Sequence, residues 1–575
     1  MAHRTRWLPW LLVVMLALGS SNPAFAQSTS EPVTLYIQGI PVFAADPQAA
    51  AATDQFELVD HLFLGLVDFE PVGRQIVPRM ATAWTFEEAT NTWTFTLRND
   101  VSWVRYDAAT DEIVPVRPVV AADFVAGIRR GCDPTPGNLY THMLAVTIAG
   151  CQAVAETDPD DLTPQSFEQI EARALDDTTL AITLTAPRAY FIPMSWLPIL
   201  RAVPGEIVDA FGADWVRPEH ILTNGPFVAT EVEPDVRMVF KRNPWLPADL
   251  AGPGNLDRVI MLQQTDVTTS FLLYLDNEID LSGSPDNMAE YLPDNPDLLA
   301  QLVLVSTSTV YEIVFDMSAP PFDDVHARRA FSAAIDRQAF VTEIIPGAGV
   351  PMMHWVPPGA FGASPIDQIG IDQGPSWGFD PDFARAELAL AGYPDCQGFP
   401  EVRLDLEPGA TFFGEFLQGM IQEHLGCPME VLDIEEFEFV TLLELISKDS
   451  PDEERPNLWV TGWSPDYPDA NNWLYDVGLH CEASNDMRAP CTAWDDLVLA
   501  AQTEPDLDRR AAMYHQAEEM MFGYEGEFRI APIFLGAASI LVKPWVSAPS
   551  DHALFTRWDW VTVDAAQQQA ARASS

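Results

Sequence analysis

The segment between residues 401 and 434 places the strongest constraint on the fold. Apolar and polar residues alternate from 402 to 406, residues 411–425 carry an apolar face with helical spacing, and residues 429–434 are apolar again. A strand, a helix and a second strand in this order predict a βαβ unit with parallel, buried strands. The chain is therefore expected to contain α/β lobes rather than a helix bundle or a β-sandwich.

The remaining periodicity also indicates a mixed α/β protein. A length of 575 residues predicts more than one domain. Short segments rich in β-branched and aromatic residues predict strands at residues 33–40, 92–97, 179–184, 227–230 and 237–241. Helical spacing predicts helices at residues 56–66, 121–130, 325–334, 337–345, 381–391 and 411–425. Residues 566–575 are expected to form a loose polar tail.

The N-terminus predicts export. Arg4 and Arg6 precede an apolar run over residues 7–18, and small residues follow, so residues 1–26 have the pattern of a secretory signal peptide. The apolar run is shorter than the roughly 20 residues that a membrane-spanning helix needs. No cysteine lies near the expected cleavage site, so a lipid anchor is not expected. We expect a soluble periplasmic or extracellular protein, with an uncleaved N-terminal anchor as the alternative.

Six cysteines in an exported chain indicate disulfides, because disulfides persist in oxidising compartments. Metal ligation is the competing interpretation, but the cysteines form no CxxC motif and have no nearby pair of histidines. Other pairings remain open, since spacing alone does not fix connectivity. Proximity in the chain gives three candidate disulfides: Cys132 with Cys151, Cys396 with Cys427, and Cys481 with Cys491.

Charge and motifs exclude several classes of function. The formal net charge of -53 disfavours nucleic-acid binding, which needs clustered lysine and arginine. The ten histidines form no HExxH motif, and the chain has no GxSxG elbow, P-loop or GxGxxG in the required setting. We therefore expect no enzymatic activity, no metal and no cofactor. A secreted hydrolase that uses a pair of acids is the remaining alternative of a different class.

Several separated segments follow one another in an order typical of one family. Residues 322–337 contain the phrases FDDV, RRAF and AIDR, and residues 462–469 have the sequence GWSPDYPD. The other segments are residues 35–47, 61–66, 76–84, 93–103, 122–130, 224–227, 243–244 and 542–546. Together they resemble the bacterial extracellular solute-binding proteins of the oligopeptide, dipeptide and nickel importer class, family 5.

The resemblance implies a fold and a function. The expected fold class is α/β: a two-lobed periplasmic-binding-protein-like fold of the class II type, with an inserted subdomain and a ligand cleft between the lobes. Lobe 1 would comprise residues 27–308 and 533–565, with the subdomain at about 73–180, and lobe 2 residues 309–532. The expected function is capture of a short peptide or peptide-like solute for an ABC permease in the membrane. A monomer is expected.

The resemblance also implies a site. Asp466, just beyond the predicted strand at 458–461, matches the family position whose aspartate pairs with a peptide's amino terminus. Trp463 and Tyr467 are candidates for the walls of the cleft, while Tyr140 and Tyr311 are candidates of lower rank. Core packing is the competing interpretation for the two aromatic walls. Asp466 itself is alternatively a turn residue, since Ser-Pro-Asp-Tyr-Pro-Asp favours turns unaided.

Two further expectations concern neighbouring residues and the ligand. Asp469 is expected to be a plain turn or cap residue. A receptor of the same fold for a non-peptide solute, such as an oligosaccharide, an opine-like compound or a metal chelate, is the alternative to a peptide receptor.

Overall fold

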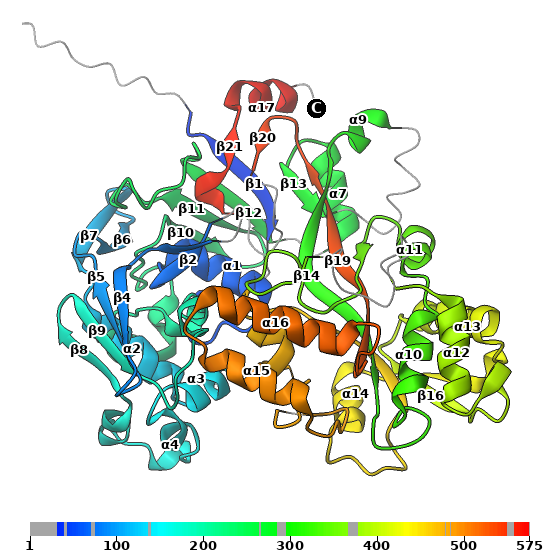
Figure 1. Ribbon diagram of the computed structural model, residues 1–575. Helices are drawn as coiled ribbons and strands as arrows, with labels where there is room; N and C mark the ends of the chain where they lie inside the picture. The colour runs from blue at the N-terminus through cyan, green and yellow to red at the C-terminus, as the bar shows by residue number, and fades with distance from the viewer. Residues whose placement is uncertain are drawn as a thin grey trace, which may run out of the picture. The chain divides into compact units, whose positions relative to one another are not determined.

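Two long neighbouring strands form the centre of the largest sheet. Strands β14 (Leu302–Phe315) and β19 (Ile530–Val542) run antiparallel, from the pair Leu302 and Leu541 to the pair Val314 and Ile530. Figure 1 shows them side by side. Their register shifts between Ser306 and Val310, where Ser308 adopts a left-handed backbone with φ of 59°. Such an irregularity bends a strand, so one strand pair serves two differently oriented parts of the sheet.

The computed structural model describes most of the chain from residue 31 onward. The predicted signal peptide, residues 1–26, lies outside the described residues. Residues from Val33 onward form one unit and are described by themselves. The described ranges are residues 31–39, 43–70, 75–135, 138, 140–263, 266–283, 295–365, 378–477, 479–483, 485–548 and 557–573.

The central pair divides the largest sheet into two halves. The strand order is β10-β11-β12-β1-β13-β19-β14-β18-β16-β17, and β15 (Gly349–Pro351) pairs separately with β19. On the β19 side the strands are β10 (Phe227–Glu233), β11 (Arg237–Arg242), β12 (Arg258–Gln263), β1 (Thr34–Gly39) and β13 (Leu281–Gly283). On the β14 side they are β18 (Leu458–Trp463), β16 (Val402–Leu406) and β17 (Leu432–Glu436).

Smaller sheets and short helices surround the first half. The strands are β2 (Val67–Phe69), β3 (Ile76–Pro78), β4 (Ala81–Glu87), β5 (Thr92–Leu97), β6 (Ser102–Asp107), β7 (Glu112–Pro118), β8 (Ala172–Asp176), β9 (Thr179–Thr183), β20 (Val546–Ser547) and β21 (Thr562–Val563). The helices are α1 (Thr53–Leu62), α2 (Ala121–Gly131), α3 (Thr141–Thr147), α4 (Cys151–Ala155), α5 (Phe191–Met194), α6 (Gly205–Phe211), α7 (Val267–Leu275) and α9 (Pro296–Leu299). Strands β4, β5, β9 and β8 form one antiparallel sheet of the region predicted as an inserted subdomain.

The second half carries most of the longer helices. They are α10 (Val325–Ala333), α11 (Arg337–Ala339), α12 (Pro381–Leu390), α13 (Thr411–Leu425), α14 (Phe439–Ile446), α15 (Ala493–Thr503) and α16 (Leu507–Phe522). The predicted βαβ unit is confirmed, since β16 and β17 pair in parallel and α13 connects them. In α13, Phe413, Leu417, Ile421 and Leu425 are buried because they recur on one face of the helix.

The buried apolar residues of the two halves form separate clusters. One large cluster runs from Leu35 to Met261 and includes Trp558 and Val563, whereas two others lie between Val310 and Leu535. A side chain of the second half, Tyr467, joins the first cluster. The fold is therefore two-lobed, and this division supports lobe boundaries near residues 308 and 532, which stay a prediction.

Two local predictions are wrong. The first predicted helix, 56–66, instead covers Thr53–Leu62, because the chain leaves helical geometry at Phe63 before it enters β2. The predicted loose tail contains helix α17 (Ala565–Arg572), capped by the Asp564 carboxylate. Gln568 anchors this helix by donating to the Asp280 carboxylate at 2.8 Å. Alanine and glutamine favour helix, and that contact 288 residues away is not visible in a local pattern.

Among the described residues, no helix has the length and apolarity that spanning a membrane requires.

The three disulfides pair as predicted. Cys132 bonds Cys151, Cys396 bonds Cys427, and Cys481 bonds Cys491, with Cα–Cα distances of 5.4, 5.0 and 5.1 Å. The second closes over the βαβ unit, since Cys427 follows the left-handed Gly426 that ends α13. Each bond removes conformational freedom from the unfolded chain.

The two disulfides of the second half are expected to differ in their contribution to stability. They close segments with sequence separations of 31 and 10 residues. Because a longer closed loop loses more entropy, the C396S/C427S variant should lower the free energy of unfolding by about 3.5 kcal/mol and the C481S/C491S variant by about 2.5 kcal/mol. Guanidinium unfolding of both oxidised variants measures the difference. A larger loss in C481S/C491S would contradict the loop-entropy account.

Candidate functional site

Asp466 lies where the sequence predicts, just beyond the end of a central strand. Strand β18 pairs with β14, with Trp463 opposite Val310. The chain then turns at Ser464, whose hydroxyl is 2.6 Å from the hydroxyl of Thr309. This end of the strand lies at the junction of the two lobes, a place where ligands bind in open α/β sheets.

The Asp466 carboxylate accepts hydrogen bonds from both lobes. The Tyr140 hydroxyl donates to Oδ1 at 2.7 Å, and the Asn472 amide donates to Oδ2 at 3.0 Å. Asn472 Oδ1 in turn accepts from the Asp466 backbone N–H at 3.0 Å and from Trp463 Nε1 at 2.9 Å. Three of the predicted site residues, Asp466, Trp463 and Tyr140, are therefore brought together, with Asn472 fixing their orientation.

The electrostatics of Asp466 reflect its removal from water. Burial raises the pKa of the Asp466 carboxyl, while the hydrogen bonds from Tyr140 and Asn472 and the nearby His142 lower it. Burial and the neighbouring Asp466 charge also raise the pKa of Tyr140, so its hydroxyl stays a donor at neutral pH. Among the described hydrogen bonds and ion pairs of Asp466, none comes from lysine or arginine. The carboxylate is thus positioned by neutral donors.

A second group of polar side chains supports the first. Asn472 and Asp476 lie one turn apart in the π-helical segment Asn472–Asp476. The Tyr467 hydroxyl donates to Asp476 Oδ2 at 2.5 Å and accepts from Asn471 Nδ2 at 3.0 Å. Burial is the largest influence on Asp476 and raises its pKa to about 7. Sequence analysis missed these residues, although the Asn-Asn pair six residues after Asp466 was a visible signal.

Tyr467 is a contact between the lobes. Its ring is 1 % exposed and stacks parallel to Tyr190, with ring centroids 5.7 Å apart. Since Tyr190 belongs to the first core cluster, the core-packing interpretation describes Tyr467 in this structure. Nearby, the Ala189 backbone N–H donates to the Gln502 carbonyl at 2.8 Å, a second contact across the lobes.

Tyr311 lines a cavity whose lining residues do not include Asp466. Its ring stacks on Phe534 at 4.6 Å and lines a cavity of about 380 Å³ with Phe412, Val460 and the exposed Glu407. Tyr311 is 37 % exposed, so its ring is accessible.

The neighbour of Tyr311 points the other way and is buried. Glu312 accepts from the Thr461 hydroxyl at 2.8 Å and from Trp355 Nε1 at 3.2 Å. Burial raises the pKa of Glu312 to about 8, so this carboxyl is mostly protonated at neutral pH.

Asp469 is a cap residue, as predicted, because its Oδ1 accepts from the Asn471 backbone N–H at 3.0 Å, and it is also one partner of a buried ion pair, which the sequence did not indicate. Its two carboxylate oxygens accept from the two terminal nitrogens of Arg510, both at 2.7 Å. The guanidinium also lies over the ring of Phe361 at 4.8 Å. Removing either partner would leave a buried charge unpaired, which makes the pair a structural lock. Arg510 is 41 residues away in sequence, beyond the reach of a local pattern.

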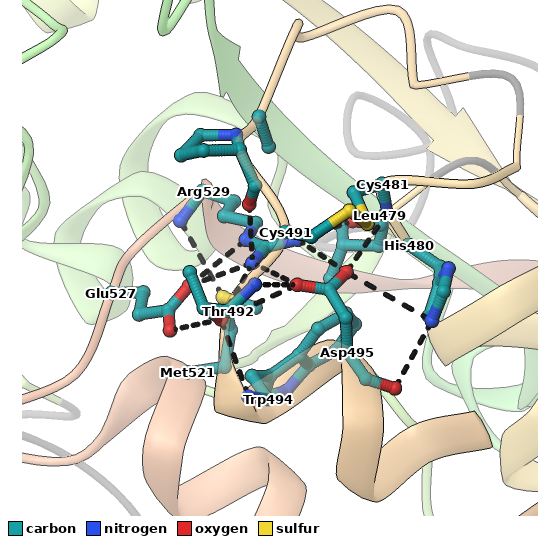
Figure 2. Close-up of polar contacts among 12 residues, drawn as sticks. Leu479, His480, Cys481, Cys491, Thr492, Trp494, Asp495, Met521, Glu527 and Arg529 are labelled. Carbon is teal, nitrogen blue, oxygen red and sulfur yellow. Dashed lines mark hydrogen bonds and ion pairs between the residues drawn. A yellow bond between two sulfur atoms is a disulfide. The ribbon is translucent and has the colours of Figure 1, made fainter.

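A cluster of His480, Cys481 and Asp495 has side chains close enough to hold a metal ion. Figure 2 shows that these side chains are engaged with one another and with their neighbours. The Asp495 carboxylate accepts from Arg529 at 3.0 and 2.7 Å, and the Cys481 sulfur is bonded to Cys491. A disulfide sulfur is not the thiolate that metals bind, so the cluster is interpreted as structural.

The fold and the site define a class of protein: a two-lobed binding protein with a carboxylate at the junction of its lobes. Residues 75–485 match the model of the bacterial extracellular solute-binding proteins, family 5. The chain belongs to this family, as the sequence resemblance indicated.

The relatives are binding proteins by name. The periplasmic oligopeptide-binding protein OppA of Escherichia coli is 25% identical over 552 residues, which cover 93% of this chain and 94% of that protein. The periplasmic murein peptide-binding protein MppA of Escherichia coli is 25% identical over 514 residues, or 87% of each chain.

Solved structures agree on the fold. The unliganded open form of the murein tripeptide binding protein MppA superposes with a TM-score of 0.75 at 24% identity and covers 93% of this chain and 96% of its own. At this identity the similarity concerns the fold and supports the two-lobed architecture.

The Tyr140 hydrogen bond is expected to control the proton affinity of Asp466. Because the bond favours the charged carboxylate, the Y140F variant should raise the pKa of Asp466 further above that of a free aspartate. Infrared titration of the carboxylate stretch, assigned by subtracting the spectrum of D466N, measures it. The matched control is Y106F, whose hydroxyl bonds the exposed Asp111 and should leave the Asp466 titration unchanged. Equal titrations in wild type and Y140F would contradict the assignment.

Proposed function

We propose that this protein is an extracytoplasmic receptor that captures a short peptide or peptide-like solute between its lobes and delivers it to an ABC permease. The family and the named relatives OppA and MppA support this proposal. The predicted signal peptide and the periplasmic relatives support a location outside the cytoplasm. In this role the protein acts as a monomer and binds its ligand without chemical turnover.

The observation that carries the proposal is the arrangement around Asp466. Its carboxylate is held by Tyr140 from one lobe and by Asn472 from the other, at 2.7 and 3.0 Å. These are neutral donors, so no lysine or arginine cation is bonded to the carboxylate among the described residues. A ligand ammonium supplies that cation, and every unblocked peptide carries one at its amino terminus. A ligand that pairs with Asp466 thus contacts groups of both lobes and stabilises their approach.

The two-strand hinge suits this role. Strands β14 and β19 connect the two halves of the sheet. The irregularity in their register, near Ser308, lies between those two halves. Rotation about such a short crossing moves the lobes without unfolding either core. A closed, loaded form would then present a different surface to the permease than the empty form.

The test compares two ligands that differ only in the ammonium. Tri-alanine and N-acetyl-tri-alanine are titrated while tryptophan fluorescence is followed, in wild type, D466N and the surface control D249N. The unblocked peptide should bind wild type and D249N, and D466N should lose about 3 kcal/mol of its binding free energy, roughly a hundredfold in affinity. The acetylated peptide should bind all three weakly.

Two outcomes would contradict the peptide proposal. The first is equal affinity for the acetylated and unblocked peptides, because the ammonium would then make no contribution. The second is saturable binding of an oligosaccharide or a metal chelate with no peptide binding, which would favour the receptor for a non-peptide solute. Product formation that follows the protein through purification would favour the hydrolase.

The affinity for a peptide should depend on pH through Asp466. The pKa of this carboxyl is raised in the ligand-free protein, and a bound ammonium favours its charged form. Binding therefore expels a proton below that pKa, so affinity should fall as the pH falls through it and stay constant above it. Isothermal titration calorimetry from pH 4 to pH 8 measures the slope. D466N has no titrating group at this position and should show a flatter profile.

A further inference from the structure

A second and larger cavity lies at the junction of the lobes. Its volume is about 800 Å³, and its walls include Trp84 and Trp93 of the β4–β5 hairpin, Ile192 of α5, and Phe361 and Leu507 of the second half. Asp466 is not among its lining residues. Tyr467, the chain neighbour of Asp466, stacks on Tyr190, and neither tyrosine is among the lining residues of the cavity. The cavity is therefore separate from the carboxylate site.

The walls are mainly apolar, and their positively charged residues outnumber their negatively charged ones. The charged residues of the lining are Arg188, Asp469 and Arg510. Asp469 and Arg510 form a buried pair with two contacts at 2.7 Å, so their charges cancel locally. Arg188 is left as the positive charge of the cavity. This stands out in a chain with a net charge of -53, where acids greatly outnumber bases.

The hydrogen bonds of Arg188 go to neutral oxygens. Its Nη1 donates to the Tyr190 hydroxyl at 2.5 Å and its Nη2 to the Val146 carbonyl at 3.0 Å. Its Nε is buried and lacks a hydrogen-bond partner within the part of the chain that the structure describes. The described ion pairs include none between Arg188 and a carboxylate. An arginine so placed is a recognition group for an oxyanion, because its fork of donors matches a carboxylate or sulfonate.

A second donor in the same wall is also unused. The indole Nε1 of Trp93 is buried without a partner among the described residues. A buried donor without an acceptor is unfavourable by about 1–3 kcal/mol, so a ligand acceptor recovers that free energy where a side-chain rearrangement brings it to either nitrogen. Arginine and indole nitrogen are both donors, which favours a ligand that brings acceptor oxygens.

Asp476, which accepts a hydrogen bond from Tyr467, is an acid close enough to Arg188 for their charges to interact. Arg188 lowers the pKa of Asp476, but burial raises it more strongly, to about 7. Near neutral pH this carboxyl is therefore only partly ionised and balances Arg188 incompletely. Tyr190 and Tyr475, which also lie near Arg188, are neutral because burial raises the pKa of each.

We propose that this cavity binds an apolar anion, with its acidic group at Arg188 and its apolar body against Trp84 and Trp93. The ligand class is an aromatic or aliphatic carboxylate or sulfonate that carries one acidic group. Arg188, Trp84 and Trp93 belong to the first half, whereas Phe361 and Leu507 of the second half line the same cavity. Such a ligand therefore touches both lobes at a second place and stabilises their contact independently of Asp466.

The experiment uses two dyes with closely related ring systems and different charge. The anion 8-anilinonaphthalene-1-sulfonate and the neutral N-phenyl-1-naphthylamine are titrated into the full-length protein, with energy transfer from tryptophan as the signal. Wild type should bind one equivalent of the anion and bind it more tightly than the neutral dye. R188Q should weaken the anion at least about tenfold, the effect of losing one charged hydrogen bond, and leave the neutral dye unchanged.

Three variants act as controls. R188K keeps the positive charge and should retain most of the affinity for the anion. R217Q removes a surface arginine that pairs with the exposed Asp214 and should change nothing. D466N should lose peptide binding but keep the anion, so the failure of one proposal does not imply failure of the other.

Several results would overturn the inference. They are an anion affinity in R188Q equal to wild type, an equal affinity of wild type for the two dyes, and a lack of saturable anion binding to wild type. If R188Q does not fold, as judged by its near-UV circular dichroism, the comparison of R188K with a W84A variant decides. W84A should then weaken both dyes, because it removes part of the apolar wall.

Discussion

The antiparallel pair of β14 and β19 is the constraint on which the rest of the structure depends. These strands are hydrogen-bonded from Leu302 and Leu541 at one end to Val314 and Ile530 at the other, so they belong to both halves of the sheet. The two halves form separate apolar clusters, and each half buries its own core. Ligand recognition is left to the surfaces that meet beside this pair. A binding protein of this design separates stability, which resides within each lobe, from function, which resides between them.

The contacts across the lobes described above are polar or aromatic. They include the hydrogen bond from Tyr140 to Asp466, the backbone bond from Ala189 to Gln502, and the parallel rings of Tyr190 and Tyr467. Each leaves a small hydrogen-bonded or stacked surface rather than a continuous core. Individually, such contacts contribute about 1 kcal/mol, which is within the range that a ligand can outweigh. The junction is thus suited to a change of population on binding.

Features were predictable from the sequence where the interacting residues are close together along the chain, and were missed where they are far apart along it. Helix α13 and strands β16 and β17 were predictable because their periodicity is local, and the disulfides because their cysteines are 10 to 31 residues apart. Asp466 was predicted because the motif around it, residues 462–469, resembles a motif of the family. Its partner Tyr140 lies 326 residues away, and only the resemblance placed it in the cleft. The pairing of Asp469 with Arg510 and the anchoring of α17 by Asp280 were missed, since neither leaves a local pattern.

The two cavities and the Asp466 site differ in charge, and this difference argues for separate ligand chemistry. The cavity beside Tyr311 contains the acid Glu407 and no lysine or arginine among its described lining residues. Asp466 adds a carboxylate held by neutral donors. Arg188 instead lines the other cavity. Because unlike charges attract across an apolar, poorly screening wall, a cationic ligand end is favoured at Asp466 and an anionic one at Arg188. The two proposed ligand groups, a cation at Asp466 and an anion at Arg188, would therefore occupy different positions at the junction.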